Sequence, residues 1–128
     1  MTPSTASLLV KIGGYASIGW LIFHLLFWQI FDWRAELKRL SRLNSGVMQV
    51  LNLCLSFIFL LFAFLSLWHT NELLSAGIGR TISLGIGVFW LFRFLLQPLF
   101  WGTSLTSALF AFLFVLMSAC YLAPWALL

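Results

Sequence analysis

Four long runs of apolar residues occupy almost the whole chain, and they restrict its possible folds more than any other feature. The runs cover residues 8–31, 47–68, 81–101 and 105–127. Each is close to the roughly 20 residues that a helix needs to cross the hydrocarbon core of a bilayer. We therefore expect an all-α membrane protein in which residues 1–128 form a single bundle of four transmembrane helices.

The overall composition agrees with a membrane-embedded chain. Hydrophobic residues make up 62% of the sequence and charged residues only 8%. A soluble domain has about 25% charged residues. The first run could be mistaken for a secretory signal peptide, but it is too long and no small-residue cleavage site follows it. We therefore keep residues 8–31 as a helix of the bundle.

Positive charge is concentrated between the first two runs. This connection holds the acidic residues Asp32 and Glu36 and a larger set of basic residues, which are Arg34, Lys38, Arg39 and Arg42. Short loops rich in Lys and Arg tend to stay on the cytoplasmic side of a membrane. The sequence therefore predicts that this loop is cytoplasmic and that both termini lie outside the cytoplasm. Because orientation and anionic lipid account for these cations, no nucleic-acid partner is implied.

The same connection has the pattern of a short amphipathic helix. Trp33, Leu37 and Leu40 recur at helical spacing among the basic residues, and Asp32 precedes them as a candidate N-cap. We expect this cytoplasmic helix to lie on the inner leaflet of the bilayer, where its partners are anionic lipids. Two interpretations remain open: the segment only sets the topology, or it also forms a docking surface for anionic lipid or another protein.

One charge lies inside an apolar run. Arg93 belongs to the run 81–101, and a charged side chain at the centre of a bilayer costs at least ~2.5 kcal/mol. Such residues normally face a bundle interior, an aqueous cavity or a partner. At a rise of 1.5 Å per residue, Arg93 falls within about 15 Å of the cytoplasmic interface together with His24, Gln49, Asn52 and Gln97. We predict that these residues form one polar site.

Small and bulky residues are distributed unevenly along the runs 8–31 and 81–101. Small residues dominate the outer halves and aromatic residues the inner halves. Small residues let helix backbones approach closely, and bulky residues hold them apart. We therefore expect the bundle to close on the outer side and to open on the cytoplasmic side as a polar pocket. Its aromatic walls would include Trp20, Trp28 and Trp90.

Two interpretations of Arg93 remain open. In the first, the polar residues satisfy one another and Arg93 is held by Gln49, Asn52 and helix carbonyls, as is common between membrane helices. In the second, Arg93 faces an anion from outside the protein, because no acidic side chain lies at its depth. A phosphate or carboxylate head group would suit the guanidinium, which can donate two parallel hydrogen bonds to it. His24 could then assist binding or proton transfer.

More specific chemistries find little support in the sequence. His24 and His69 lie near opposite membrane faces, so they do not suit the two axial positions of one haem. Cys54 and Cys120 form neither a CxxC motif nor a metal-ligand spacing, and no convincing acid and base flank a buried serine. We therefore expect no metal and no cofactor, and nothing in the sequence positively indicates an enzyme.

Several segments resemble a family of small four-helix bacterial membrane proteins known mainly as hypothetical: 31–37 (FDWRAEL), 40–44 (LSRLN), 79–85 (GRTISLG) and 89–93 (FWLFR). The resemblance covers most of the chain. It implies a four-helix protein of the bacterial inner membrane, and it implies no activity. Residues 93–103 (RFLLQPLFWGT) are also similar to a stretch of the small sterol-biosynthesis scaffold proteins of eukaryotes, which tether enzymes and do not catalyse.

Two functional hypotheses follow. The first is a non-enzymatic accessory or scaffold protein that packs through its small-residue faces against another membrane protein or a second copy of itself. The alternative is a binder, carrier or processor of an anionic lipid or isoprenoid-type amphiphile in the pocket around Arg93.

Overall fold

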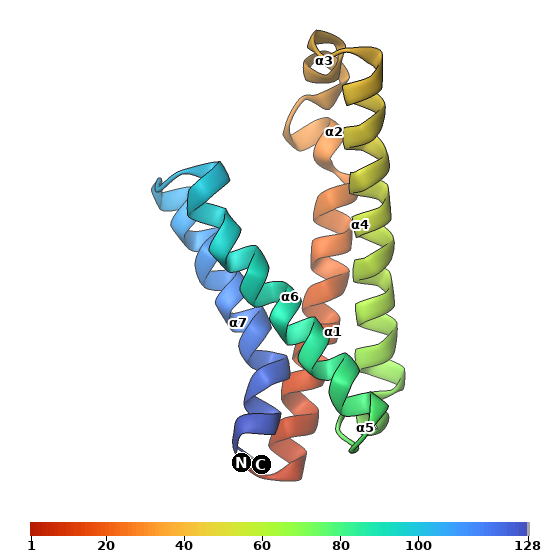
Figure 1. The fold of residues 1–128 in the computed structure, drawn as a ribbon, viewed down its shortest axis with the longest axis vertical. Coiled ribbons are helices and arrows are strands. Elements are labelled where there is room, and N and C mark those ends of the chain that lie inside the picture. The colour runs from red at the N-terminus through yellow and green to blue at the C-terminus, as the bar shows by residue number, and fades with distance from the viewer. Residues whose placement is uncertain (128) are drawn as a thin grey trace.

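The structure is a computed structural model that describes residues 1–127, and within this range it contains helices and no strand. The long helices are α1 (Pro3–Leu25), α4 (Arg42–Trp68), α6 (Ile78–Trp101) and α7 (Leu105–Leu127) (Figure 1). All four are long and apolar enough to cross a membrane. The chain therefore has the helices of a multi-pass membrane protein. Short elements complete it: α2 (Phe27–Ile30), α3 (Trp33–Glu36), η1 (Leu37–Arg39) and α5 (Thr70–Leu73).

Helices α1 and α4 begin earlier than the apolar runs because polar caps decide where they start. The Thr2 hydroxyl accepts a hydrogen bond from the Thr5 N–H at 3.2 Å, so α1 begins at Pro3. The Ser41 hydroxyl accepts one from the Asn44 N–H at 3.1 Å, so α4 begins at Arg42. At the other end α1 stops at Leu25. The run 8–31 is therefore divided between α1 and α2.

Two short helical turns occupy the basic connection. A single amphipathic helix over this segment is not confirmed, because α3 spans one turn and η1 continues it as a 3-10 turn. Asp32 precedes α3 in the left-handed conformation, with φ of 50°, and its side chain makes no capping hydrogen bond. Leu37 is buried, whereas Leu40 is exposed.

The long helices form two hairpins. Helix α1 packs along α4, and α6 packs along α7. Figure 1 shows that the hairpins lie together at the end that holds both termini and α5, and that they diverge toward α3 and the α6–α7 turn. Contacts of α1 with α7 and of α5 with α6 join them. We call these two ends the closed end and the open end.

Glycines allow the close approach at the closed end. A Cβ at Gly13 would collide with the ring of Tyr121, and one at Gly87 would collide with the side chain of Leu122. The Tyr121 hydroxyl and the Ser66 hydroxyl share a hydrogen bond of 2.7 Å that links α7 to α4. Small residues and interhelical hydrogen bonds are the usual means by which membrane helices associate.

Aromatic side chains fill the space where the hairpins begin to separate. The Trp90 ring is stacked on the Phe59 ring, with centroids 5.3 Å apart and planes 9° apart, and on the Phe114 ring at 5.8 Å and 18°. Trp20 adds a contact to Phe114 at 5.0 Å. These residues come from all four long helices. Their bulk keeps the backbones apart and leaves a cavity next to them.

Candidate functional site

A cavity of about 180 Å³ lies between the two hairpins, on the side toward the open end. All four long helices and α2 contribute to its wall. Aromatic side chains form most of it, and the polar exceptions are Arg93 and His24. The complete lining is Trp20, Phe23, His24, Phe27, Leu55, Phe59, Phe89, Trp90, Arg93, Trp101, Phe110 and Phe114.

Arg93 is held in this cavity by aromatic faces. Its guanidinium carbon lies 4.5 Å from the centroid of the Phe114 ring and 5.6 Å from that of the Trp101 ring. Both distances are within the range of a cation–π interaction. Within residues 1–127, Arg93 forms no salt bridge and its side chain takes part in no hydrogen bond. The positive charge therefore has aromatic neighbours and no counter-ion from the described part of the chain.

The three acidic side chains of the chain lie away from this cavity. Glu36 pairs with Arg39 at 3.5 Å in the connection between α2 and α4. Glu72 lies in α5 at the closed end, where its pKa is lowered by a hydrogen bond from its own backbone N–H and then by one from the side chain of His69. Asp32 belongs to the basic connection. Within residues 1–127 no carboxylate therefore lines the cavity that holds Arg93.

His24 is oriented by its own helix. Its Nδ1 lies 2.9 Å from the carbonyl oxygen of Trp20. Because a carbonyl oxygen can only accept, this bond assigns the proton to Nδ1 and leaves Nε2 as the second polar atom of the ring. The ring is stacked on Phe27 at 4.4 Å and 29°. Among residues 1–127 no hydrogen bond involves Nε2.

Trp90 carries a buried, unpaired donor. Only 1% of its surface is exposed, and its indole N–H has no hydrogen-bond acceptor among the described residues. A buried donor without a partner costs about 1–3 kcal/mol. Trp90 lies one turn before Arg93 on α6 and its ring lines the same cavity, but the indole nitrogen itself is covered by protein atoms.

Asn52 and Gln49 form hydrogen bonds of their own. Asn52 is buried, and its side-chain amide donates to the carbonyl oxygen of His24 at 2.9 Å. The Gln49 amide donates to the backbone of Ser45 at 3.3 Å and accepts from the Trp28 indole at 3.4 Å. Neither residue is hydrogen-bonded to Arg93. The hydrogen bonds among the predicted polar residues therefore do not include its guanidinium.

Gln97 lies apart from the Arg93 cavity. It is fully buried between α6 and α7, and its Nε2 donates to the hydroxyl of Ser107 at 3.1 Å. Its Oε1 has no partner among the described residues. A separate hollow of about 220 Å³ adjoins it, lined also by Phe94 and Pro98.

The basic connection borders a second polar pocket of about 430 Å³. Arg34, Lys38 and Arg42 line it, together with both indoles of this region, Trp28 and Trp33. Arg39 is not part of its lining and pairs instead with Glu36 at 3.5 Å. Trp28 and Gln49 therefore belong to this surface pocket and do not line the cavity of Arg93.

The sequence analysis did not single out Phe114, Trp101 and Phe59 as partners of the predicted site. Trp101 lies two helical turns after Arg93, so helical spacing could have found it. Phe114 and Phe59 come from other helices, and in an apolar sequence with 14 phenylalanines no local signal distinguishes them. Their place in the cavity follows only from the packing of the hairpins.

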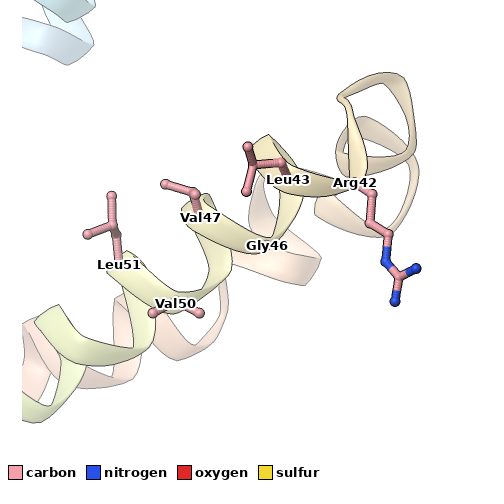
Figure 2. A pocket seen from close by; sticks show the side chains of 6 residues that line it. All are labelled: Arg42, Leu43, Gly46, Val47, Val50 and Leu51. Carbon is pink, nitrogen blue, oxygen red and sulfur yellow. The ribbon is translucent and has the colours of Figure 1, made fainter.

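A larger hollow of about 790 Å³ lies on the outer surface of α4. Figure 2 shows that Leu43, Val47 and Leu51 project from one side of the helix and that Arg42 points away from them. Every residue that lines it comes from α4. Apart from Arg42 at its edge, this surface is apolar and open, as a helix face toward lipid would be.

Within residues 1–127 no group of three or more His, Cys, Asp or Glu side chains is placed to hold a metal ion. No family model, no curated protein and no solved structure matches the chain. The resemblances seen in the sequence therefore remain expectations, and the functional argument depends on the site itself.

Proposed function

We propose that this protein binds an anionic amphiphile, such as a lipid or isoprenoid-type phosphate or carboxylate, with the anionic head group at Arg93. The observation that supports this proposal most directly is the state of Arg93. Its charge lies in an aromatic cavity between the hairpins without an acidic or hydrogen-bonding partner from residues 1–127. A partner from outside the chain would supply the missing negative charge.

The aromatic environment leaves the hydrogen-bonding groups of Arg93 available. A cation over a ring face interacts through its charge, so the N–H groups of the guanidinium are not consumed by Phe114 or Trp101. A guanidinium matches a carboxylate or phosphate with two parallel hydrogen bonds.

The rest of the cavity favours an amphipathic ligand over a free hydrophilic ion. Apart from Arg93 and His24 its lining is apolar, and it lies within helices that could span a membrane. A volume of about 180 Å³ suits a small head group and excludes a whole lipid. The hydrocarbon part of such a ligand would remain outside the cavity.

The orientation and the membrane are part of this proposal. The open end carries the basic connection, and loops rich in Lys and Arg favour the cytoplasmic side. We accordingly infer that the open end faces the cytoplasm of a bacterium, with the chain in its inner membrane and both termini on the outer side. Helix α3 and η1 would then lie at the inner leaflet as a short amphipathic segment, with Arg34, Lys38 and Arg42 toward anionic lipid.

Native mass spectrometry with lipid extraction tests the proposal on wild type, Arg93→Gln and Arg80→Gln. Arg80 is the matched control, because it also lies over an indole, that of Trp125 at 5.1 Å, but on the part of α6 near the closed end. We expect an anionic amphiphile to co-purify with wild type and Arg80→Gln and to be lost from Arg93→Gln. Equal ligand content in all three proteins would overturn the proposal.

An accessory or scaffold role is the second candidate. Its support is the apolar face of α4 (Figure 2), where Leu43 is 74% exposed and Leu51 64% exposed. The small-residue faces are less available for a partner, because Gly13, Gly14 and Gly87 pack against side chains of this chain. Cross-linking from Leu51 in native membranes would reveal a protein partner at α4. The absence of any cross-linked protein would argue against this role.

A further inference from the structure

An apolar groove of about 450 Å³ runs between α1 and α7 on the outside of the bundle. Its α1 side includes Ile12, Ala16 and Gly19, and its α7 side includes Leu113, Leu116 and Met117. A Cβ at Gly19 would meet no atom within 4 Å, so the small residue there leaves real space in the groove.

This groove adjoins the cavity that holds Arg93. Trp20, Phe23 and Phe110 line both hollows. These rings contact one another across α1 and α7, with Trp20 6.0 Å and Phe23 5.6 Å from Phe110 between ring centroids, so a molecule whose polar end lies at Arg93 must pass them to reach the apolar groove. The groove continues along α1 from Phe23 to Ile12, which is about 16 Å at the helical rise.

We propose that the hydrocarbon chain of the ligand lies in this groove between α1 and α7, with its anionic head group at Arg93. The inference rests on the proposed function and adds the ligand class to it. The ligand would be an amphiphile with one linear hydrocarbon chain, and the protein supplies a binding groove for this chain. The arrangement separates two tasks. The cavity recognises charge, and the groove recognises the chain.

The size of the cavity and the adjacency of the two hollows both point to this occupant. A head group fills the smaller volume, and the chain must leave it on a side where apolar surface is open. A chain in the groove would touch both hairpins at once, since α1 and α7 belong to different pairs. A bulk lipid chain that only passes over the surface would have no head group at Arg93.

The test compares two ligands that share a head group, dodecyl phosphate and butyl phosphate, on protein in nanodiscs of zwitterionic lipid. Empty nanodiscs correct for partition into the bilayer, and phosphorus NMR titration measures binding. Gly19→Leu fills the groove. Gly85→Leu is the matched control, because Gly85 on α6 has equally open space and lies outside both hollows.

We expect Gly19→Leu to lower the affinity for dodecyl phosphate about tenfold, because the new side chain overlaps with the hydrocarbon chain. The affinity for butyl phosphate should not change. Gly85→Leu should bind both ligands as wild type does. Thermal unfolding of each variant shows whether the bundle is intact, and Ala16→Leu provides a second filled groove should Gly19→Leu not fold.

Arg93→Gln separates failure of this inference from failure of the proposed function. Binding of both phosphates by Arg93→Gln at wild-type strength would overturn the proposed function together with the groove. Loss of both phosphates in Arg93→Gln, with dodecyl phosphate unaffected by Gly19→Leu, would overturn the groove alone. An equal loss of affinity for both phosphates in Gly19→Leu would also contradict a chain-binding groove, because butyl phosphate is too short to reach it.

Discussion

The guanidinium of Arg93 lies over the ring of Phe114, with 4.5 Å between the guanidinium carbon and the ring centroid. This contact joins α6 to α7 at the cavity and is the shortest of the cation–π contacts in the described part of the chain. It explains how a charge is kept between apolar helices without a carboxylate: the π face supplies negative potential where no anionic side chain is present.

Replacing Phe114 should therefore cost more than the loss of its packing. Phe114→Leu keeps an apolar side chain but removes the ring below Arg93, and we expect the free energy of unfolding to fall by about 1–3 kcal/mol. Phe112→Leu is the control, because Phe112 on the same helix is 59% exposed and should change stability by less than about 0.5 kcal/mol. Reversible unfolding in mixed micelles measures both. A similar loss in the two variants would show that the cation–π contact contributes little.

Close approach at Gly87 should be sensitive to a single methyl group. In Gly87→Ala the new Cβ meets the Leu122 side chain at 2.5 Å, so this side chain must change its rotamer or α6 and α7 must move apart, and we expect a loss of about 1–3 kcal/mol. Gly85→Ala, on the same helix with open space at its Cβ, should be neutral or more stable by up to about 1 kcal/mol. Thermal denaturation in detergent ranks the variants. If Gly85→Ala were destabilised and Gly87→Ala were unchanged, the close packing of α6 on α7 at Gly87 would be contradicted.

The hydrogen bond between Ser66 and Tyr121 should couple the two hairpins. Tyr121→Phe removes the hydroxyl that lies 2.7 Å from Ser66 Oγ, and such interhelical bonds contribute about 0.6 kcal/mol on average and at most about 1.7. A double-mutant cycle with Ser66→Ala isolates this coupling energy from the packing of the ring. Additive effects of the two substitutions would mean that the hydroxyls do not stabilise the closed end.

The basic connection should select anionic lipid through three of its four cations. Replacing Arg34, Lys38 and Arg42 together by Gln should reduce the enrichment of phosphatidylglycerol around the protein, at about 1 kcal/mol per charge, and added salt should reproduce the effect. Arg39→Gln is the control, because Arg39 is already paired with Glu36. Native mass spectrometry from mixed-lipid nanodiscs reports the enrichment. An equal effect of Arg39→Gln would indicate a diffuse charge effect without a defined pocket.

The proposed orientation predicts which end of the bundle a membrane-impermeant thiol reagent can reach. In a background with Cys54→Ser and Cys120→Ala, Thr103→Cys in the α6–α7 turn should react only from the cytoplasmic side. Ala76→Cys, before α6 at the closed end, should react only from the outside. Labelling of whole cells and inverted vesicles distinguishes the two. The opposite pattern would place the Arg93 cavity toward the outer leaflet.

Much of the fold could be predicted from the sequence, because the length of an apolar run is a local property. The ends of three helices, at Trp68, Trp101 and Leu127, coincide with the ends of the apolar runs. Helices α1 and α4 start before their apolar runs do, because capping hydrogen bonds to Thr2 and Ser41 fix their first residues. The basic connection was expected to be one helix and forms α3 and η1.

The candidate site could be predicted only in part. Helical rise places five polar residues at a similar depth, namely His24, Gln49, Asn52, Arg93 and Gln97. Depth alone does not say which way each side chain points. The structure brings Arg93 and His24 to one cavity. Asn52 instead meets a carbonyl of α1 and Gln97 meets α7, because each helix is rotated about its axis by contacts that depth does not describe.

The sequence by itself determined that four apolar helices form this protein, that its charge gathers in one connection, and that a lone Arg lies among aromatic residues. Only the tertiary structure decided that Phe114 and Trp101 hold this Arg and that a groove between α1 and α7 adjoins its cavity. The reason is physical. Hydropathy and helical rise describe the position of a residue along the helix axis. Which helix faces pack against each other is decided by close approach at small residues such as Gly13 and Gly87.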